Sequence, residues 1–243
     1  MKTLLITRPR DQSEQLAVVL TGMGFNTLIE PLLSVRLLEA AAPEGVHDGA
    51  VITSGYAIPS LDRMVAADCR SDYPVLSVGD ATLKKLRAAG FSNSRSAGGS
   101  ADDLIAEAPE YFLQQTGQSG PKLIYPCARE TARDLVAVFA EGPLTVEPWP
   151  VYETIPADSF SGPIRRALIS GDVDGVLLYS GRTADAYSTL FDSLLAEYDD
   201  NLRLPVLYCL SRQVADRIPH AHHNQIKIAC HPDQESLLGL LHD

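Results

Sequence analysis

Two stretches of this chain repeat the same residue pattern, and this internal duplication limits its possible folds more than any other feature. The first copy begins with KTLLITRPRDQSEQLAVVLTGMGFNTLIEPLLSV and the second with PKLIYPCARETARDLVAVFAEGPLTVEPWPVYET. The match continues with HDGAVITSGYAIPSL against VDGVLLYSGRTADAYSTL, and with YPVLSVGDATLKKLRAAG against LPVLYCLSRQVADRI. The offset of roughly 120 to 130 residues is far longer than a solenoid or propeller repeat. We therefore expect two similar domains with a ligand-binding cleft between them.

Composition is that of an ordinary soluble globular protein, and the N-terminal sequence leads us to expect a cytoplasmic location. Its 243 residues are 45% hydrophobic and 21% charged, and we expect no transmembrane helix. The opening MKTLLITRPRDQ predicts a buried first strand rather than a signal peptide. The formal net charge of −11 argues against nucleic acid or an anionic membrane as a partner. A small anionic ligand stays possible, because a local basic pocket can oppose the overall sign.

No residue pattern indicates a metal, a disulfide or a cofactor. The four cysteines are scattered and form no C-x-x-C pair: Cys69, Cys127, Cys209 and Cys230. For the small cluster of His220, His222 and His223, a solvated loop is favoured over a metal site. Nucleotide-binding loops, a G-x-S-x-G elbow and an H-E-x-x-H motif are all missing from the sequence.

Apolar runs alternate with helical patterns along the whole chain, which predicts parallel sheets with right-handed crossovers. Buried strands are predicted at 4–7, 27–35, 50–53, 75–78, 122–125, 145–151, 175–179, 206–210 and 227–229, with a short one at 94–96. Helices are predicted at 11–22, 81–89, 101–108, 130–140, 183–198 and 234–241. The capping residues expected at three of these helices are Asp11 with Glu14, Asp80, and Ser100 with Asp103.

Two proline-marked extended segments, 30–38 and 147–155, occupy matching positions in the two copies. If each leaves one domain and enters the other, the domains are not simple halves. We then expect a discontinuous domain 1 of residues 1–36 and 157–243, and a continuous domain 2 of residues 37–156. A division into an N-terminal and a C-terminal half is the alternative.

Ligands of open parallel sheets lie beyond the carboxyl ends of the strands, so the residues that follow each strand are the binding candidates. These loops are rich in Ser, Thr, Gly and Arg, and each leads into a helix N-terminus that favours anions. Five of their residues are arginines, which suits a polyanionic ligand: Arg8, Arg10, Arg129, Arg182 and Arg212. The alternative to a binding site is that Ser and Thr serve only as helix caps and that the arginines are solvated surface residues.

Two aromatic residues mark the second crossing segment. Tyr152 lies at a strand end, where its hydroxyl can act as a hydrogen-bond donor or weak acid. A tyrosine that merely packs at the domain junction is an equal alternative. Trp149, between Pro148 and Pro150, is interpreted as a packing residue.

The order of these motifs resembles the uroporphyrinogen-III synthase family over essentially the whole chain. The likeness rests on ITRP, DGAVITSGYA, VGDATLKKL, VYET and DGVLLYSGRTA, which follow one another along the chain in this order. It implies two flavodoxin-like α/β domains joined by a two-stranded linker. It also implies a cofactor-free lyase of tetrapyrrole biosynthesis, which cyclises hydroxymethylbilane with loss of water and inversion of ring D, through a spiro intermediate, to uroporphyrinogen III.

The resemblance also assigns roles to individual residues. Tyr152 matches the tyrosine of the family's VY-x-T segment, the candidate acid for hydroxyl departure. Ser54, Thr82 and Ser180 match residues of the family's own motifs. The chain departs from the family at Gly181 and Arg182, which replace Pro and Ser, and at Ser211 and Arg212, which stand where the family often has a G-x-T-T-A loop. The predicted substrate-binding set is Arg8, Arg10, Ser54, Thr82, Arg129, Ser180, Arg182, Ser211 and Arg212, in a monomer that binds the polycarboxylate hydroxymethylbilane.

Two other classes of protein fit parts of the pattern. A two-domain sensor could close on a small anion without chemistry, and tight binding of a simple sugar or amino acid would favour it. A glycosyltransferase-like enzyme is disfavoured, because no nucleotide-binding loop is evident and each lobe is small.

Overall fold

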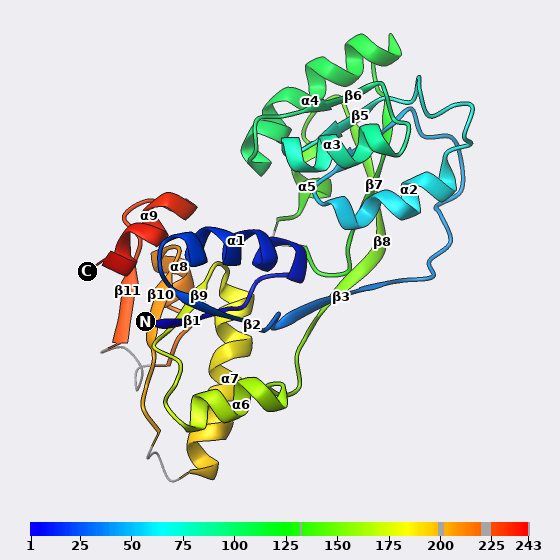
Figure 1. The fold of residues 1–243 in the computed structure, drawn as a ribbon. Coiled ribbons are helices and arrows are strands. Elements are labelled where there is room, and N and C mark those ends of the chain that lie inside the picture. Colours follow the sequence, from blue (N-terminus) through cyan, green and yellow to red (C-terminus); the bar gives the residue numbers. More distant parts are fainter. Residues whose placement is uncertain (132, 199–201, 220–224, 243) are drawn as a thin grey trace. The chain divides into compact units, whose positions relative to one another are not determined.

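The computed structural model describes residues 1–131, 133–198, 202–219 and 225–242. It divides the chain into two compact units (Figure 1). Unit 1 combines Met1–Ser34 with Ile155–Asp243, and unit 2 is Val35–Thr154. The chain thus leaves unit 1 after its first two strands, completes unit 2, and then returns.

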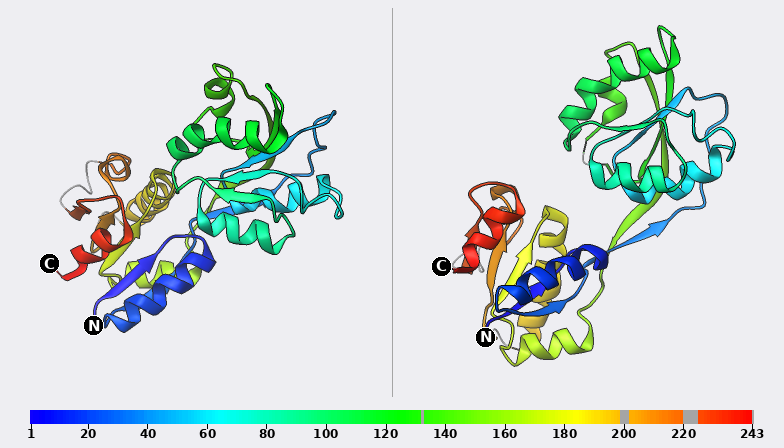
Figure 2. Two further views of the ribbon diagram at one scale, coloured as in Figure 1. Left: turned by 90° about the horizontal axis from the view of Figure 1, so that it is seen from above. Right: turned by 45° about the horizontal axis from the view of Figure 1, so that its top comes forward.

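Unit 1 is a five-stranded parallel sheet with helices on both faces (Figures 1 and 2). Its strands, in the order β11-β10-β9-β1-β2, are β1 (Thr3–Ile6), β2 (Asn26–Ile29), β9 (Gly175–Leu178), β10 (Val206–Cys209) and β11 (Ile226–Ile228). One face is covered by α1 (Arg10–Gly22) and α9 (Gln234–Gly239), which is followed by the 3₁₀ turn η3 (Leu240–His242). The other face is covered by α6 (Gly162–Ile169), α7 (Gly181–Glu197) and α8 (Arg212–Ala215).

Unit 2 is built in the same way around a second sheet. Its strands, in the order β3-β8-β7-β4-β5-β6, are β3 (Leu33–Leu37), β4 (Gly49–Ile52), β5 (Val75–Ser77), β6 (Ser94–Ser96), β7 (Lys122–Ala128) and β8 (Thr145–Pro156). The 3₁₀ turn η1 (Gly55–Ala57), α2 (Ile58–Met64) and α3 (Asp80–Ala88) pack on one face. Helices α4 (Ala101–Thr116) and α5 (Leu135–Phe139) pack on the other.

The two sheets share one spatial arrangement although their chain order differs. In unit 1 the strands, numbered along the chain, lie in the order 2-1-3-4-5, which is the flavodoxin-like order. In unit 2 the five strands that correspond to them are β8, β7, β4, β5 and β6. The second sheet is therefore a circular permutation of the first, because β1 and β2 precede the insertion of unit 2 while β7 and β8 end it. The predicted α/β class with two flavodoxin-like parallel sheets is confirmed.

The repeated Asp-Gly pair has a structural cause in both units. Asp174 Oδ2 accepts a hydrogen bond from the Thr3 N–H, and Asp48 Oδ2 accepts one from the Lys122 N–H, each at 2.8 Å. Each aspartate thus binds the start of the neighbouring central strand. A Cβ atom on Gly49 would lie only 2.7 Å from Phe112 Cε1. The duplicated motif therefore serves strand pairing and packing rather than chemistry.

The two crossing segments pair with each other. β3 and β8 run antiparallel, since the Leu38 N–H donates to Val151 O at 2.8 Å and the Ala157 N–H donates to Leu32 O at 2.9 Å. The predicted strand at 27–35 is wrong as one element, because β2 ends at Ile29 and β3 begins at Leu33 in the other sheet. Pro31 lies between them, where its missing N–H cannot serve a ladder.

Several helix predictions need correction. Helices α2, α6 and α8 were not expected; α2 and α6 carry a proline in the first turn, where the missing N–H has no intrahelical partner to lose. The helix predicted at 130–140 is confined to α5, because the Asp134 carboxylate accepts from the Ala137 N–H and starts the helix at Leu135. Helix α4 continues past 108 with Pro109 inside it.

Helix caps were predicted with mixed success. The Ser100–Asp103 capping box at α4 is confirmed. Asp11 and Asp80 are wrong as caps, since both lie within the first turn, and Pro9 and Gly79 hold the N-cap positions. Glu14 makes no capping bond and faces Arg10 instead.

No helix among the described residues combines the length and the apolar character that a membrane span requires.

Candidate active site

Tyr152 lies on β8 directly after a β-bulge. The register between β7 and β8 pairs Cys127 with Pro150 but Ala128 with Tyr152, so Val151 is the extra residue. In a regular strand, Val151 and Tyr152 would face opposite sides of the sheet. The bulge breaks that period, and both side chains enter the same core cluster as Trp149. Tyr152 is only 8% exposed, so the strand irregularity decides where its hydroxyl is presented.

Two other tyrosines of unit 2, Tyr56 and Tyr125, lie near Tyr152. The Tyr56 ring, from η1, lies 6.0 Å from the Tyr152 ring at an interplanar angle of 49°. Tyr125 lies on β7, and its hydroxyl is 3.3 Å from Thr53 Oγ1 at the end of β4. Burial raises the pKa of Tyr125, and the nearby Tyr152 adds to this rise, while the Thr53 bond opposes it. These neighbours form a partly buried phenol cluster at the carboxyl end of β4.

Strand β7 is longer than predicted, which changes the roles of its last residues. Cys127, which lies beyond the predicted strand end at 125, is buried within the strand and is not a loop residue, since β7 continues to Ala128. Burial raises the pKa of the Cys127 thiol to about 11, which keeps it protonated and unsuited to act as a nucleophile. Arg129 is therefore the first residue beyond the strand.

Arg129 is held beside Tyr152 by main chain and side chain. Its N–H donates to Tyr152 O at 2.8 Å, and its Nη1 lies 2.6 Å from Glu153 Oε2. The other carboxylate oxygen of Glu153 accepts from Arg36 Nε at 2.6 Å, and Arg36 Nη2 also pairs with it. One carboxylate thus fixes two guanidinium groups next to the candidate acid.

The other two predicted residues of unit 2 begin helical turns. Ser54 Oγ accepts from the Tyr56 N–H at 3.4 Å and caps η1. Thr82 is half-buried in the first turn of α3. Between these turns, the Lys85 stem approaches Gly55 so closely that a Cβ there would lie 2.9 Å from Lys85 Cδ. Gly55 therefore lets a lysine pack over the turn that carries Tyr56.

At the carboxyl edge of unit 1, Arg8 is held by an aromatic ring and by a glutamine side chain. Its guanidinium carbon lies 4.1 Å from the centre of the Tyr179 ring, and its Nη1 donates to Gln234 Oε1 at 3.3 Å. Burial raises the pKa of Tyr179, while the charge of Arg8 lowers it in part. The Arg8 guanidinium is thus stacked on an aromatic face at the end of β1, which restricts where it can point.

The remaining predicted residues of unit 1 sit at helix starts. Ser180 caps α7 and Ser211 caps α8, accepting from the Thr183 and Val214 N–H groups respectively. Arg10, Arg182 and Arg212 are exposed residues in first turns, where the helix dipole opposes a cation. Arg10 Nη1 is 4.0 Å from Glu14 Oε1, and Arg212 Nε is 3.1 Å from Asp216 Oδ1.

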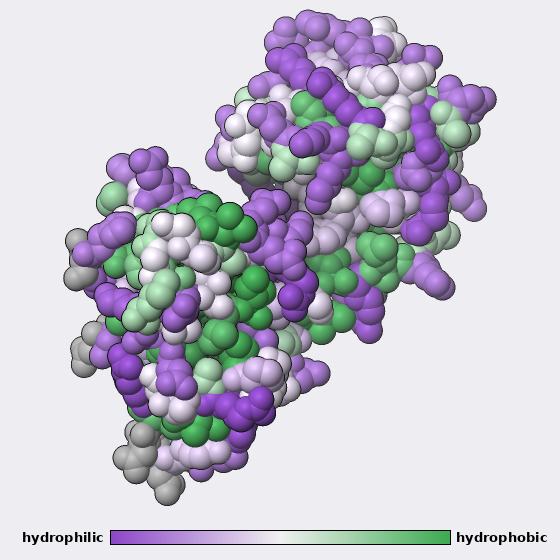
Figure 3. All heavy atoms as spheres, in the orientation of Figure 1, coloured by the Kyte–Doolittle hydropathy of each residue, from purple (hydrophilic) through white to green (hydrophobic). Residues whose placement is uncertain are grey.

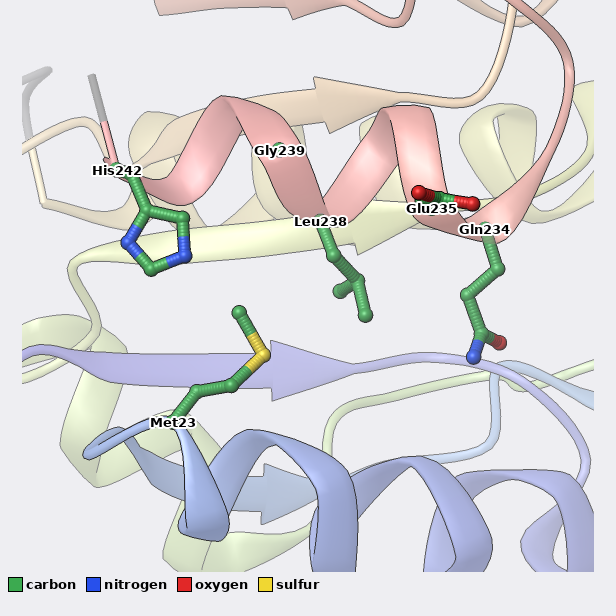
Figure 4. A pocket seen from close by; sticks show the side chains of 6 residues that line it. All are labelled: Met23, Gln234, Glu235, Leu238, Gly239 and His242. Atoms are coloured by element: carbon green, nitrogen blue, oxygen red, sulfur yellow. The ribbon is translucent and has the colours of Figure 1, made fainter.

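Two grooves border helices α1 and α9 of unit 1. One, of about 390 Å³, includes Arg8 and Gln234 in its lining. The other, of about 530 Å³, is lined by Met23 and by Leu238 and His242, whose side chains converge in Figure 4. Figure 3 shows apolar surface where α1 lies, and Val18 of that helix is 74% exposed. The first groove joins the carboxyl edge to the helix surface.

Among the described residues, no group of three or more His, Cys, Asp or Glu side chains is placed to hold a metal ion. The cluster of His220, His222 and His223 lies outside the described residues.

Sequence reasoning missed three residues around Tyr152 and the turn that carries Tyr56: Arg36, Lys85 and Glu153. Tyr56 itself lies in the loop after the strand predicted at 50–53 and was therefore among the binding candidates. Arg36 and Glu153 lie in the two segments that were predicted to cross. An antiparallel pairing of those segments would have set them opposite each other. Tyr56 and Lys85 come together only through the packing of η1 against α3, for which the sequence carries no local signal.

Comparisons with known proteins agree with this fold. The sequence profile of the family described as uroporphyrinogen-III synthase HemD matches residues 14–239. A crystal structure of uroporphyrinogen-III synthetase from Helicobacter pylori 26695 is similar with a TM-score of 0.61 and 15% identity, covering 99% of this chain and 98% of that one. A mutant uroporphyrinogen III synthase from the extremely thermophilic bacterium Thermus thermophilus gives a TM-score of 0.53 and 16% identity, covering 100% and 98%. No curated protein gave a significant sequence match.

Proposed function

The chain belongs to the uroporphyrinogen-III synthase family, and from this premise we propose how its own residues carry out the reaction. The enzyme is a cyclising lyase of tetrapyrrole biosynthesis. We propose that it takes hydroxymethylbilane, a linear tetrapyrrole with eight carboxylates, and closes it with inversion of ring D and loss of water. The profile match over nearly the whole chain carries this proposal.

Tyr152 is the proposed acid. A phenol is a weak acid, and here it is set by the β-bulge in a partly buried cluster with Tyr56. It donates its proton to the leaving hydroxyl of the bilane, which departs as water. The electron-rich pyrrole stabilises the methylene cation that remains, and ring D attacks it through its substituted carbon to give a spiro intermediate. The bond from that carbon to the methylene of ring C then breaks, and this methylene forms a new bond to the unsubstituted α-carbon of ring D, which leaves the ring inverted. The proton lost from ring D at the end of the reaction restores the balance.

Binding of the carboxylates is proposed to fall to the predicted arginines and helix starts of each unit. Arg8 and Arg129 are already held in place, by the Tyr179 ring and by Glu153. Main-chain N–H groups at the first turns favour anions, and the residues that stand there are Ser54, Thr82, Ser180 and Ser211. Further charge at the same edges comes from the exposed Arg10, Arg182 and Arg212.

Positioning is sufficient for the selectivity that such an enzyme needs. Hydroxymethylbilane closes without help to the type I isomer, so the enzyme must favour one closure over another. A 100-fold preference corresponds to about 2.7 kcal/mol of barrier difference. Orientation and fixed charges supply free energies of that size. We further propose that the protein acts as a cytoplasmic monomer without a cofactor.

The test is an isomer assay. The purified protein is given freshly generated hydroxymethylbilane, and the products are oxidised and separated by chromatography. We expect the type III isomer to dominate and to form faster than the type I isomer forms in a protein-free control. Type I product alone, at the rate of the control, would rule the activity out.

A further inference from the structure

We propose that Arg36 and Arg129 together bind one carboxylate of the substrate, and that Glu153 is the positioning residue that holds the two guanidinium groups for it. This inference deepens the proposed function and rests on it. It adds Arg36 and Glu153 to the site and gives Arg129 a defined partner. All three residues lie within unit 2.

The pairing geometry divides the Glu153 carboxylate between the two arginines. Oε1 accepts from Arg36 Nε at 2.6 Å and also pairs with Arg36 Nη2, whereas Oε2 pairs with Arg129 Nη1 at 2.6 Å. Two like charges are thus brought to one carboxylate, which offsets their mutual repulsion. The cluster keeps a net charge of about +1, because one anion faces two cations.

The three side chains of this cluster differ in their exposure to solvent. The Glu153 side chain is only 13% exposed, whereas the Arg36 and Arg129 side chains are 65% and 58% exposed. The anion therefore lies inward and the cations face outward. Among the described residues, no second partner is paired with Arg36 Nη1 or with Arg129 Nε and Nη2. These outward N–H groups suit a second carboxylate, since a guanidinium matches carboxylate geometry with paired donors.

The backbone fixes the cluster next to the candidate acid. Glu153 directly follows Tyr152, and the Arg129 N–H donates to Tyr152 O. Arg36 stands opposite Glu153 in the antiparallel β3–β8 pair, where cross-strand side chains are neighbours. A substrate carboxylate bound here would lie at the carboxyl end of β7, beside the backbone of Tyr152, and would contribute to binding of the substrate.

A purely structural role is the competing explanation, and the chain offers a matched control for it. Glu147 lies on the same strand β8 and also joins two basic side chains, with His47 Nε2 at 2.9 Å and Lys122 Nζ at 2.6 Å from its Oε2. This cluster sits at the start of β7, at the opposite end of the sheet from Tyr152. A clamp that only stabilises unit 2 should behave alike at Glu147 and Glu153.

The experiment compares Glu153→Gln, Arg36→Gln and Glu147→Gln with the parent protein, using steady-state turnover of freshly generated hydroxymethylbilane. For Glu153→Gln and Arg36→Gln we expect KM to rise about tenfold or more, as for a lost charged contact, with kcat changed by less than about threefold. Because fewer ions are paired, KM should also depend less on salt concentration. In Glu147→Gln, KM should stay at the parent value.

Further measurements separate the possible outcomes. The double variant Arg36→Gln with Glu153→Gln should raise KM no more than Glu153→Gln alone, because both changes remove one contact. Thermal unfolding identifies variants that fail to fold. If Glu153→Gln does not fold, Arg36→Gln still tests whether the two arginines bind a substrate carboxylate. An unchanged KM in Arg36→Gln, or an equal rise in Glu147→Gln, overturns the inference. If the parent protein forms only the type I isomer, the proposed function itself has failed, and this is seen before any variant is compared.

Discussion

Unit 1 and unit 2 have the same order of strands in space, yet their carboxyl edges have diverged. In unit 1 the second strand, β2, has four residues and ends before Pro31. Its counterpart in unit 2, β8, has twelve residues and contains the bulge that places Tyr152. The Asp-Gly pairs that bind the central strands are the same in both units. Duplication has therefore kept the interactions that build a sheet and freed the residues beyond it.

The turns after β4 and β9 show the same contrast at close range. Ser54 and Ser180 occupy equivalent positions, and both begin a helical turn with their hydroxyl as the acceptor. The residue before each differs, however: Thr53 bonds the Tyr125 hydroxyl in unit 2, whereas Tyr179 supports Arg8 in unit 1. A shared cap thus presents a phenol cluster in one unit and a stacked cation in the other.

The largest expected effect is the loss of turnover when the Tyr152 hydroxyl, at the carboxyl edge of unit 2, is removed. Tyr152→Phe should lower kcat by about 100- to 10,000-fold, the range for losing a general acid, without lowering the melting temperature. Turnover of hydroxymethylbilane and thermal unfolding measure the two quantities. Tyr73→Phe is the matched control, because its buried hydroxyl has no partner among the described residues and lies just before β5. Unchanged turnover in Tyr152→Phe would remove this residue from the mechanism.

A smaller effect is expected on the free energy of unfolding when the glycine of each Asp-Gly pair is replaced. Gly49→Ala and Gly175→Ala should each destabilise by about 1–3 kcal/mol through overpacking, measured by urea unfolding followed by circular dichroism. A Cβ at position 49 would also lie 2.8 Å from the backbone oxygen of Pro74, whereas at position 175 it meets the Tyr208 and Leu4 side chains. Side chains yield more easily than backbone, so Gly49→Ala should cost more. A larger loss of stability in Gly175→Ala than in Gly49→Ala would contradict this explanation.

The smallest effect concerns the equivalent helices α4 and α9, whose caps are reversed. Ser100 caps α4 with Asp103 three residues on, whereas Asp233 caps α9 with Ser236 three residues on. Hydrogen bonds from Ser100 lower the pKa of Asp103, and those from Ser236 lower that of Asp233, from an ordinary 3.8. A lowered folded-state pKa stabilises the protein fully above 3.8, and this contribution is lost as the pH falls through the lowered value.

Asp103→Asn and Asp233→Asn should therefore differ most from the parent at neutral pH. Urea midpoints measured between pH 7 and pH 3 should show the difference shrinking in acid for both variants. A difference that grows on acidification would contradict the capping role of these carboxylates.

Much of the architecture could be predicted from local pattern. Alternating apolar runs indicated the parallel sheets, and Ser100 with Asp103 indicated the start of α4, because periodicity and capping act over a few residues. The surroundings of Tyr152 could not be predicted in the same way. The bulge at Val151 depends on the register with β7, and the pairing of Arg36 with Glu153 depends on β3 lying beside β8.

The sequence by itself determined that this protein is a duplicated α/β chain of the uroporphyrinogen-III synthase family, since repeats, strand patterns and motif order are all written along the chain. Only the tertiary structure decided that the second sheet is a circular permutation of the first. It also decided that one extra residue turns Tyr152 onto the face of Val151, and that Glu153 gathers two arginines beside it. The physical reason is that strand register and cross-strand contacts join residues that lie far apart in the sequence, where no local pattern records their pairing.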